Sequence, residues 1–444
     1  MTQRDLQSPG TGIVELTPGT DVTITGMVQS LRRMAWGGFL LLRTGRSLIQ
    51  VVLDASIPGV PIDSIHPEAT VRVIGLVKEA KITDRAVTPS NAEVQASAVT
   101  VISSPDIHEF PVDITKKELT TGLSTLFDHR PLTLRHPKQR ALFRVQAAVQ
   151  NAFVATLSSL GFTRIASPKL VASGAEGGAN IFELDYFGTP AYLAQSPQFY
   201  KQMMVAVFDR VFETAPVFRA EKHNTSRHLN EYISLDFEMR LTDSYEEIMQ
   251  VEAAVLNGIF DAVRTSCEHE VRLLEIEVPA PVESLTIVPF DEAVELVYQD
   301  AGVDVRGEPD LSPEAEAALS AYAKREWGAD FVFVSEFPSS KRPFYTMDCP
   351  DNPERTNSFD LLFRGVEITT GGQRLHRYAD YVEKMTGLGM DPAQFQSYLQ
   401  AFSFGMPPHG GLGFGLERFT AKLCGIENVK ALSLFPRDLN RLEP

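Results

Sequence analysis

The chain has 444 residues, of which 43% are hydrophobic and 22% are charged, so we expect about two or three domains with sizeable cores. No stretch approaches the roughly 18 consecutive apolar residues of a membrane span, the N-terminal segment lacks the apolar core of a secretory signal, and the three cysteines show no CxxC spacing. These features favour a cytoplasmic protein without membrane contact, zinc site or disulfide framework, and the net charge of −16 by itself argues against a nucleic-acid partner.

The N-terminal part, residues 1–103, has the pattern of a small β domain. Its five expected strands are short, rich in β-branched residues and separated by Gly, Asn, Pro or Asp. They cover residues 21–31, 39–43, 47–54, 70–80 and 92–102. Five short strands within about 80 residues predict a closed barrel, for which the OB-fold is the leading candidate. The number of strands alone leaves a generic β-sandwich as the alternative.

The charges of this N-terminal part cancel, because it contains nine Lys or Arg residues and nine Asp or Glu residues. The whole net charge of −16 therefore belongs to residues 104–444. Within the barrel segment, basic residues gather at Arg32, Arg33, Arg43 and Arg46. An acidic body with a neutral, locally basic module is compatible with RNA binding.

The pattern changes at the end of the barrel segment. Residues 104–132 are punctuated by proline and show no sustained period, which predicts a linker or hinge. From Pro137 onward, apolar residues at helical spacing predict a helix that ends at Gly161. Residues 133–444 then mix long amphipathic helices with paired strands. This mixture predicts an α+β catalytic domain built on an antiparallel sheet flanked by helices.

Three stretches of the second domain carry ionisable residues or glycines in unusual density. In the first, two expected strands are joined by a polar loop, and alternation places Arg219 and Glu221 on one face. Arg227, Asp236 and Glu238 follow nearby. One such strand alone would be a solvated hairpin with surface ion pairs. Both strands together favour a site for a polyphosphate or a carboxylate, because arginine offers paired donors to such anions.

The second stretch, residues 359–378, places Asp360 and Glu367 on expected strands and follows them with a small-residue turn that contains Thr370. The glycines of this turn would let a ligand approach the backbone closely. A carboxylate beside a hydroxyl suits Mg²⁺, which prefers oxygen ligands and substrate phosphates. This stretch therefore predicts a magnesium site beside a nucleotide.

The third stretch contains glycines at Gly411, Gly413 and Gly415, after which Glu417 and Arg418 open an expected helix. It lacks the GxGxxG fingerprint of a dinucleotide-binding fold and the Gly-Lys-Ser/Thr of a P-loop. A glycine-rich strand that leads into a helix is weak evidence of function when taken alone. On that evidence Arg418 is equally compatible with a surface position on the helix.

Together the three stretches resemble the signature motifs of the class II aminoacyl-tRNA synthetases. The helix ending near Gly161 and the strand signal at Pro168 are similar to motif 1, FRAE…RHLNEYISLDFE to motif 2, and GLGFGLER to motif 3. The segments YLAQSPQFYKQMM, FRGVEITTGGQR, FGMPPHGG and LFPRDLNRLEP resemble the aspartyl branch of class IIb in its shorter, archaeal-type form. The resemblance covers nearly the whole chain. It implies an aspartate–tRNA ligase whose OB-fold barrel binds the anticodon.

The resemblance also implies roles for individual residues. Lys201 and Arg374 would hold the side-chain carboxylate of aspartate. The full aspartate-binding set comprises Glu176, Gln198, Lys201, Arg219, Asp236, Thr370 and Arg374. The ATP-binding set comprises Arg219, Glu221, Arg227, His228, Leu229, Glu367, Gly415, Leu416, Glu417 and Arg418. Glu367 and Thr370 would hold Mg²⁺ as the cofactor. Arg219 and Arg418 would act in catalysis.

The implied reaction needs no covalent enzyme intermediate. The α-carboxylate of aspartate attacks the α-phosphate of ATP, pyrophosphate leaves, and the terminal adenosine of tRNA then takes the aspartyl group. Catalysis would rest on positioning and electrostatics, which fits a sequence without an obvious Ser/His/Asp triad.

For tRNA, the resemblance implies contacts in the barrel. Phe39 and Gln50 match positions that contact anticodon bases, and the alternative is that Phe39 belongs to the barrel core. Gln29 and Pro89 stand where strict enzymes tend to carry Trp and Lys, so the chain is expected to charge both tRNA-Asp and tRNA-Asn. A tRNA-dependent amidotransferase would then be a partner. Motif 1 implies a homodimer.

Four alternatives stay open. An asparagine–tRNA ligase has the same architecture, but Lys201 argues against it because an uncharged amide does not need a buried cation. A strictly tRNA-Asp-specific enzyme would differ only in the barrel. A paralogue that makes aspartyl-adenylate for amide synthesis would not need an anticodon-binding barrel. A non-catalytic RNA-binding regulator would not need the intact set of Arg219, Glu367 and Arg418.

Overall fold

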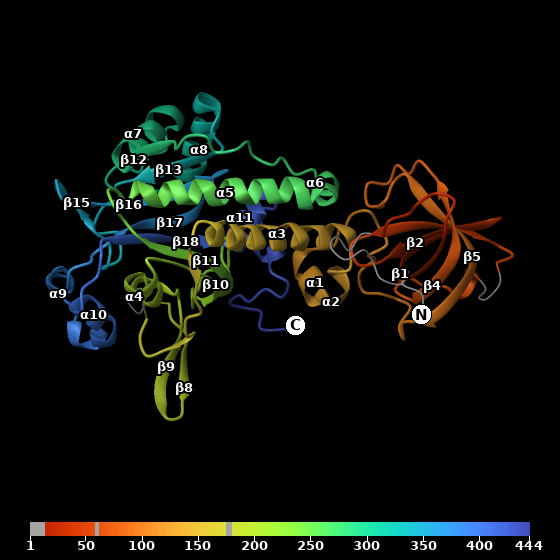
Figure 1. The fold of residues 1–444 in the computed structure, drawn as a ribbon, viewed down its shortest axis with the longest axis horizontal. Coiled ribbons are helices and arrows are strands. Elements are labelled where there is room, and N and C mark those ends of the chain that lie inside the picture. The colour runs from red at the N-terminus through yellow and green to blue at the C-terminus, as the bar shows by residue number, and fades with distance from the viewer. Residues whose placement is uncertain (1–13, 58–61, 175–179) are drawn as a thin grey trace. The chain divides into compact units, whose positions relative to one another are not determined.

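The computed structural model describes residues 14–57, 62–174 and 180–444. The chain divides into two compact units, and both are drawn in Figure 1. The first unit runs to Leu142 and includes residues 272–275 and Pro444, while the second comprises residues 143–271 and 276–443. Among the described helices, none is long and apolar enough to cross a membrane.

A closed five-stranded barrel forms the core of the first unit (Figure 1). Its strands are β1 (Asp21–Met34), β2 (Gly37–Arg43), β3 (Leu48–Asp54), β4 (Thr70–Glu79) and β5 (Ala92–Ser103). They follow the order β1-β2-β3-β5-β4, and β1 pairs with β4 to close the ring. β3 and β5 pair in parallel, whereas the other neighbours are antiparallel. This closed order confirms the predicted OB-fold and excludes the β-sandwich.

Alternation along each strand decides which side chains fill the barrel. On β3, Ile49, Val51 and Leu53 are buried in the barrel core, whereas Gln50 and Val52 are half-buried. Successive side chains of a strand point to opposite faces, so Gln50 and Val52 lie on the outer surface. The sequence pattern of the strand thus separates a packing face from a face that can meet a ligand.

The segment that follows the barrel is more ordered than the predicted linker. It contains α1 (Leu123–Asp128) and α2 (Arg130–Thr133), and a small apolar cluster forms around Ile114 and Leu126. The next helix, α3 (Pro137–Ser159), begins with proline, which is favoured at the first helical position because its missing N–H needs no partner there. The division between the two units falls within α3, and the domain boundaries expected from the sequence stay predictions.

An eight-stranded sheet forms the centre of the second unit, in the order β12-β13-β16-β17-β18-β11-β10-β6. The strands are β6 (Thr163–Arg164), β10 (Arg210–Phe218), β11 (Glu231–Arg240), β12 (Ile287–Pro289), β13 (Phe331–Ser335), β16 (Ser358–Phe363), β17 (Val366–Arg374) and β18 (His409–Gly415). The central pairs are antiparallel, as predicted. The pairs at the two edges, β12 with β13 and β6 with β10, are parallel.

Helices cover both faces of this sheet. The helices that follow α3 along the chain are α4 (Gln198–Phe208), α5 (Glu246–Ser266), α6 (Glu268–Leu274), α7 (Phe290–Ala301), α8 (Pro313–Trp327), α9 (Tyr378–Gly387), α10 (Gln396–Ser403) and α11 (Leu416–Leu423). Short 3₁₀ turns are η1 (Ile62–Ser64) in the first unit and η2 (Pro392–Phe395) and η3 (Val429–Leu432) in the second. On one face, Phe331 of β13 packs against Phe260 of α5, with ring centroids 5.7 Å apart. On the other face, Val332 and Val334 join the apolar core of α7 and α8. The second unit is therefore the predicted α+β domain.

Two small sheets lie beside the large one. They consist of β7 (Leu170–Val171), β8 (Glu183–Tyr186) and β9 (Thr189–Leu193), and of β14 (Asp348–Cys349) and β15 (Asn352–Thr356). The strand expected around Pro168 is present only as the two-residue pieces β6 and β7 on either side of it. Proline has no N–H to continue a ladder, so the strand is interrupted there.

Candidate active site

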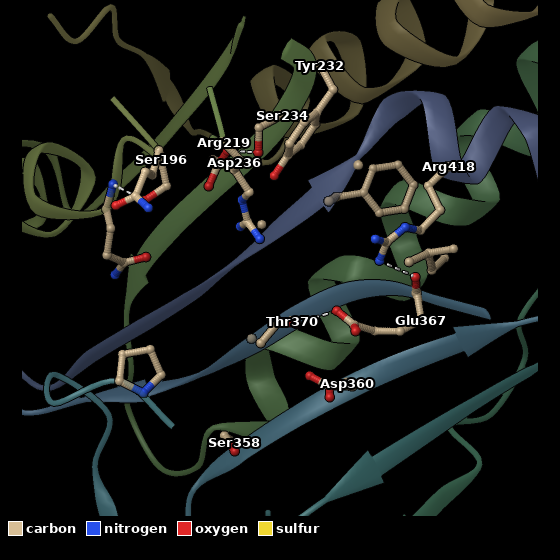
Figure 2. A pocket seen from close by; sticks show the side chains of 18 of the residues that line it. Ser196, Arg219, Tyr232, Ser234, Asp236, Ser358, Asp360, Glu367, Thr370 and Arg418 are labelled. Atoms are coloured by element: carbon tan, nitrogen blue, oxygen red, sulfur yellow. Dashed lines mark hydrogen bonds between the residues drawn. The ribbon is translucent and has the colours of Figure 1, made fainter. Parts of the chain in front are cut away.

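A cavity of about 440 Å³ opens on the second unit where the central strands meet α4 and α11. Figure 2 shows part of its lining. The residues expected to bind aspartate or ATP that line it are Gln198, Lys201, Arg219, Glu221, Arg227, His228, Leu229, Asp236, Glu367, Thr370, Arg374, Gly415, Glu417 and Arg418. Leu416 is buried as the first residue of α11 and does not line the cavity. Glu176 lies outside the described residues.

The register of the sheet brings residues from four strands into one row. Asp236 of β11 pairs with Gly413 of β18, which pairs in turn with Thr370 of β17. Thr370 pairs with Asp360 of β16. A Cβ atom at residue 413 would lie 3.2 Å from Asp236 Oδ1. The glycine therefore keeps the middle of the row open for a ligand between the Asp236 carboxylate and the Thr370 hydroxyl.

A β-bulge places Glu367 and Thr370 on the same face of β17. The two residues are three positions apart, and in a regular strand this spacing would put them on opposite faces. The register to β16 shifts between them, since Leu361 pairs with Thr369 while Leu362 pairs with Glu367. The shift reverses the alternation. The Thr370 hydroxyl donates to Glu367 Oε1 at 2.7 Å, as Figure 2 shows.

Two buried cations mark one side of the cavity, where the resemblance places the amino acid (the amino-acid side). Lys201 Nζ donates to Asp236 Oδ1 at 2.8 Å and to the carbonyl oxygen of Leu412 at 2.7 Å. Arg374 Nε donates to Glu238 Oε1 at 3.0 Å. The Lys201 and Arg374 side chains are only 1% and 6% exposed. Buried charges persist only with close partners, so the fold itself holds these cations in position.

Glu238 is the counter-charge that both cations share. Its Oε2 lies 3.6 Å from Lys201 Nζ, and its side chain is fully buried. It follows Asp236 by two residues on β11, so both carboxylates point to the same face. Sequence reasoning noticed Glu238 as one of several ionisable residues and gave it no role. Alternation does not say which carboxylate meets which cation, and no other signal in the sequence does.

The other side of the cavity, where the resemblance places ATP (the nucleotide side), begins where β10 ends. Arg219 Nη1 lies 3.8 Å from Glu221 Oε1, and the guanidinium carbon lies 5.8 Å from the ring centroid of Tyr232. His228 Nε2 lies 3.4 Å from the other oxygen of Glu221. Burial lowers the pKa of His228, although Glu221 acts in the opposite direction. The imidazole is therefore mostly neutral near pH 7.

Two further arginines reach the cavity from a loop and from α11. Arg227 Nη1 lies 3.2 Å from Glu316 Oε2, an oxygen that also accepts from the backbone N–H of Glu367. Burial raises the pKa of Glu316. Arg418 Nη1 donates to the carbonyl oxygen of Glu367 at 2.9 Å (Figure 2). Arg418 is thus a cavity residue, and the alternative that it lies on an ordinary surface helix is wrong.

Glu417 lines the cavity, but its carboxylate is used within the fold. Both of its oxygens accept from the backbone N–H of Ile233 at 3.1 Å, which ties α11 to β11. Burial raises the pKa of Glu417 to about 7, although these N–H contacts act in the opposite direction. The contact of Glu417 with ATP that the resemblance implies stays a prediction.

The cavity also contains two basic residues, Lys341 and Arg342, that sequence reasoning missed. Arg342 Nη2 lies 2.8 Å from Asp360 Oδ1, and Arg342 Nε donates to Ser358 Oγ at 3.0 Å. Lys341 pairs with Asp310 on the same wall. Burial raises the pKa of Asp360 to about 7 against the opposing effect of Arg342. A lysine–arginine pair in a loop has no sequence signal that separates it from surface residues.

Glu367 and Thr370 bring two oxygen donors together on the cavity wall. Such hard donors fit Mg²⁺, which proteins often bind through one or two carboxylates while substrate phosphates complete its shell. Within the described part of the chain, no group of three or more His, Cys, Asp or Glu residues is arranged to hold a metal ion. Two oxygen donors fit a metal ion whose remaining ligands come from the phosphates of a nucleotide.

On the first unit, the residues expected to contact the anticodon lie on the outer surface of the barrel. Phe39 is half-buried and outside the barrel core, and its ring meets Trp36 edge-on with centroids 5.4 Å apart. The alternative that Phe39 belongs to the core is therefore wrong. Gln50 lies on the neighbouring strand, and its Nε2 donates to Glu93 Oε2 at 2.7 Å.

The two residues expected to decide tRNA choice differ in their surroundings. Gln29 is buried, its Nε2 donates to the carbonyl oxygen of Ile114 at 2.7 Å, and its Oε1 accepts from Arg43 at 2.7 Å. Pro89 follows a cis peptide bond and is half-buried between β4 and β5. An influence of Gln29 on tRNA would therefore pass through Arg43 or Ile114. The role of both residues stays a prediction.

The chain matches the family model of tRNA synthetases class II (D, K and N) over residues 123–439. It is 45% identical over 426 residues to the aspartate–tRNA(Asp/Asn) ligase of Thermus thermophilus, covering 96% of the chain and 97% of the relative. It is 37% identical to the aspartate–tRNA(Asp) ligase of Pyrococcus abyssi, covering 97% and 98%. The asparaginyl-tRNA synthetase of Pyrococcus horikoshii complexed with asparaginyl-adenylate matches at a TM-score of 0.85 and 28% identity, covering 96% and 97%.

Proposed function

The chain belongs to the class II tRNA synthetase family for D, K and N, and we propose that it activates L-aspartate with ATP and ligates it to tRNA. The observation that carries the choice of aspartate is the pair of buried cations, Lys201 and Arg374, in the wall of the cavity. Nucleotide binding follows from the arginines on the opposite side. The barrel supports the proposal that the chain binds the anticodon.

The matched family includes enzymes for aspartate and for asparagine, so residues in the cavity must discriminate between the two amino acids. An amide gains little from two cations in a site with little water, whereas a carboxylate forms charge-assisted hydrogen bonds with both. Within the described residues, the hydrogen bonds of Arg374 engage Nε and Nη2, which leaves the Nη1 donors to a ligand. These charges favour aspartate and disfavour an asparagine–tRNA ligase.

The ammonium group of aspartate would lie near Gln198 and Asp236. Gln198 Nε2 donates to Gln202 Oε1 at 2.9 Å, so its carbonyl oxygen can accept from an ammonium. Asp236 accepts from Lys201 and from the hydroxyl of Ser234, which orient its carboxylate. Glu176 belongs to the same expected set and lies outside the described residues. These acceptors complement the two cations, as a zwitterionic amino acid requires.

The nucleotide would occupy the side lined by Arg219, Arg227 and Arg418. The α-carboxylate of aspartate is the nucleophile: it attacks the α-phosphorus, the bond to the bridging oxygen breaks, and pyrophosphate leaves. Arg219 would stabilise the charge that develops on the α-phosphate. The nucleophile carries no proton to remove, so no general base is needed, which is compatible with a neutral His228. In the second step the terminal hydroxyl of tRNA attacks the carbonyl carbon, the bond from that carbon to the phosphate oxygen breaks, and AMP leaves, its phosphate taking up the hydroxyl proton.

We propose Mg²⁺ as the cofactor, held by Glu367 and Thr370 together with the nucleotide. When bound, the ion would neutralise phosphate charge and so ease the departure of pyrophosphate. The fold prepares the two donors in advance. The bulge in β17 turns them to one face, and Arg418 holds the backbone of Glu367 through its carbonyl oxygen.

We propose that the barrel, residues 1–103, binds the anticodon and that residues 104–132 join it to the catalytic domain of residues 133–444. On the barrel surface, Phe39 offers a ring for a stacked base, worth roughly 1–3 kcal/mol, and Gln50 offers an amide. Charging of both tRNA-Asp and tRNA-Asn is supported by the 45% identity to a relative that is named for both tRNAs. The residues at positions 29 and 89 are consistent with it.

Two partners follow from this function. Aspartate placed on tRNA-Asn must be amidated before it can be used for asparagine, so a tRNA-dependent amidotransferase is the expected partner. Motif 1, which comprises α3 and the strand pieces around Pro168, is the proposed homodimer interface. Both belong to the proposal and rest on the resemblance.

ATP–pyrophosphate exchange without tRNA tests the choice of amino acid. Exchange with aspartate should exceed exchange with asparagine by about 100-fold or more. Exchange with asparagine alone would contradict the role given to Lys201 and Arg374. Charging of purified tRNA-Asp and tRNA-Asn then tests the tRNA choice, and charging of tRNA-Asp alone would remove the relaxed specificity but leave the ligase. Phe39→Ala should raise the KM for tRNA about 5- to 100-fold without affecting exchange.

A further inference from the structure

Behind Gln198 lies a set of buried polar side chains for which the proposed reaction has no role. They are Gln202 of α4, Tyr381 of α9, Tyr398 of α10 and His409 of β18, and each is at most 2% exposed. These four do not line the cavity, whereas Gln198 does. Buried polar groups cost free energy unless they are hydrogen-bonded, so the partners of this set show what it does.

Pro407 determines which nitrogen of His409 carries the hydrogen. His409 Nδ1 lies 2.9 Å from the carbonyl oxygen of Pro407, which can only accept, so Nδ1 is the donor. Burial lowers the pKa of His409 to about 4, so the imidazole is neutral near pH 7. In a neutral ring whose Nδ1 is protonated, Nε2 has only a lone pair. His409 Nε2 is therefore a fixed acceptor in the interior.

This acceptor orients the amide of Gln202. Gln202 Nε2 lies 3.0 Å from His409 Nε2 and donates one hydrogen to it. A reversed amide would place its oxygen against the lone pair of the imidazole, and the two acceptors would repel each other. The oxygen of Gln202 therefore points away from His409, where it accepts from Gln198 Nε2 and from Tyr398 OH, both at 2.9 Å.

The two tyrosines close a ring of hydrogen bonds with Gln202 but give the ring no direction. Gln202 Nε2 also donates to Tyr381 OH at 3.1 Å, and the hydroxyl oxygens of Tyr381 and Tyr398 lie 2.9 Å apart. Because a hydroxyl can donate or accept, the ring would be equally satisfied with the Gln202 amide and both hydroxyls reversed. Among the described residues of this network, His409 alone distinguishes the two directions.

We infer that His409, acting through Gln202, fixes the Gln198 amide with its oxygen toward the cavity and thereby selects ligands that carry an ammonium group. The inference rests on the proposed aspartate site. Gln198 gives its NH₂ group to Gln202, which leaves the carbonyl oxygen to a ligand, and an ammonium can only donate. In the reversed network Gln198 would turn its NH₂ group toward the ammonium, and two donors would meet. His409 and Gln202 are thus positioning residues.

Calorimetric titration of the full-length protein with L-aspartate and with L-malate tests this inference, because malate has a hydroxyl group in place of the ammonium. His409→Leu leaves one N–H of Gln202 without its acceptor, so the network should reverse. The affinity for aspartate should then fall about tenfold or more. The affinity for malate should change by less than about threefold, because its hydroxyl can also accept from an NH₂ group.

Tyr398→Phe is the matched control. It removes a buried hydrogen bond to the same amide, that of Gln202, but keeps the contact with His409. Both affinities should therefore stay within about threefold of those of the unaltered protein. If malate binding is too weak to measure, the contrast in aspartate affinity between His409→Leu and Tyr398→Phe decides. Should thermal unfolding show that His409→Leu does not fold, Gln202→Leu replaces it, because it also separates Gln198 from His409.

The ¹⁵N NMR spectrum of the unaltered protein, labelled at histidine, gives a second measurement. Its His409 signals should be those of a neutral ring with a protonated Nδ1 and an unprotonated Nε2. They are identified by their loss in His409→Leu or, if that variant does not fold, in His409→Gln. A protonated Nε2 would overturn the inference, because Gln202 would then have to present its oxygen to His409.

Three binding results would also overturn the inference. Equal losses for aspartate and malate in His409→Leu would show a general disturbance of the site, and unchanged affinities would show that His409 sets no direction. A loss in Tyr398→Phe as selective as that in His409→Leu would assign the direction to the tyrosines. In each case the role of His409 falls while the proposed function stands. If the unaltered protein neither binds aspartate nor exchanges pyrophosphate with it, the proposed function itself fails.

Discussion

The two sides of the cavity hold their charges in different ways. On the amino-acid side, the side chains of Lys201 and Arg374 are 1% and 6% exposed, and a carboxylate oxygen lies 2.8 Å and 3.0 Å from their nitrogens. On the nucleotide side, the side chains of Arg219 and Arg227 are 37% and 31% exposed, and the corresponding distances are 3.8 Å and 3.2 Å. The first pair is part of the packed interior, whereas water reaches the second pair.

This difference matches what each side would have to recognise in the proposed reaction. One small carboxylate must be distinguished from an amide, and cations fixed in a region with little water give the largest difference in energy between the two. ATP is larger and carries many phosphate oxygens, so arginines that keep access to water can follow the phosphates as the reaction proceeds. Mutations on the amino-acid side should therefore affect folding and activity together, and mutations on the nucleotide side should affect activity alone.

Lys201→Met should produce the largest effect. The variant keeps most of the apolar stem but leaves Asp236 and Glu238 buried without that charge, at a cost of roughly 3–5 kcal/mol in the free energy of unfolding. Exchange with aspartate should fall by about 10³-fold or more, because a desolvated charge pair with the substrate is lost. Urea denaturation and ATP–pyrophosphate exchange measure the two effects.

Lys169→Met is the matched control for this variant. Lys169 also pairs with a buried carboxylate, Glu213, at 3.0 Å, but neither residue lines the cavity. The control should lose stability and keep its exchange activity with aspartate. A Lys201→Met protein as stable as the unaltered one would show that Asp236 and Glu238 do not depend on this cation. That result would contradict the idea that charges on the amino-acid side stabilise the fold more than charges on the nucleotide side do.

Arg219→Ala should separate activity from stability. Removing this guanidinium should lower kcat for exchange about 10²- to 10³-fold, because a donor to the developing phosphate charge is lost. Its side chain is 37% exposed, and charges at such positions contribute little to stability, so the free energy of unfolding should change by less than about 1 kcal/mol. The rate of ATP–pyrophosphate exchange tests the effect on kcat, and urea denaturation tests the effect on stability. A large loss of stability would place Arg219 with the structural charges.

Arg240→Ala serves as the control on the nucleotide side. Arg240 is exposed, pairs with Asp209 at 3.6 Å and does not line the cavity. Both activity and stability should stay close to those of the unaltered protein. If Arg240→Ala lowered exchange as much as Arg219→Ala does, the loss would reflect overall charge and not a contact with the nucleotide.

Much of the fold could be predicted because local patterns decide it. The barrel strands and α5 each bury one face, and their periodicity shows in the sequence. Helices α7 to α10 were not predicted, although α8 carries clear signals. Ser312 caps it by accepting from the N–H of Ala315, Pro313 occupies its first turn, and Gly328 ends it in the left-handed conformation. Its alanine-rich sequence shows little contrast between faces, which is why periodicity did not reveal it.

Many residues of the site could be predicted from the sequence, but their arrangement in space could not. The resemblance named Glu367 and Thr370, yet nothing in the sequence announces the bulge that turns both to one face. The row that joins Asp236 to Thr370 depends on the register of strands far apart in the chain. Arg342 and Glu238 show the same limit, since the role of a charged residue depends on the partner that the fold brings to it.

Glu252 tests whether a buried carboxylate in this protein stays ionised only when a cation pairs with it. Like Glu238 it is buried, but burial raises the pKa of Glu252 to about 8, and the Thr369 hydroxyl offsets only part of this. The pKa in the folded protein exceeds its ordinary value of 4.5, so the folded state holds the proton more tightly than the unfolded chain. The free energy of unfolding should therefore fall as the pH rises from about 4.5 through 8.

Glu252→Gln should remove this pH dependence. At pH 9 the neutral amide should stabilise the protein by roughly 2–4 kcal/mol, and at pH 5 the two proteins should agree within about 1 kcal/mol. Urea denaturation at both pH values makes the measurement, with Glu246→Gln on the exposed start of the same helix as the control. An equal effect of Glu252→Gln at both pH values would show that the carboxyl group is not protonated in the folded state.

Thr370→Val should give the smallest effect and the sharpest test of an adaptable nucleotide side. Valine keeps the shape of threonine but removes the hydroxyl that donates to Glu367, whereas Thr370→Ser keeps it. The Mg²⁺ concentration for half-maximal exchange should rise about tenfold in the valine variant, or roughly 1.4 kcal/mol, and stay within about twofold in the serine variant. If serine behaves like valine, the methyl group and the packing of the bulge matter more than the hydroxyl. A loss in Thr370→Val that excess Mg²⁺ restores, beside a loss in Lys201→Met that excess aspartate does not restore, would mark the nucleotide side as adjustable and the amino-acid side as fixed.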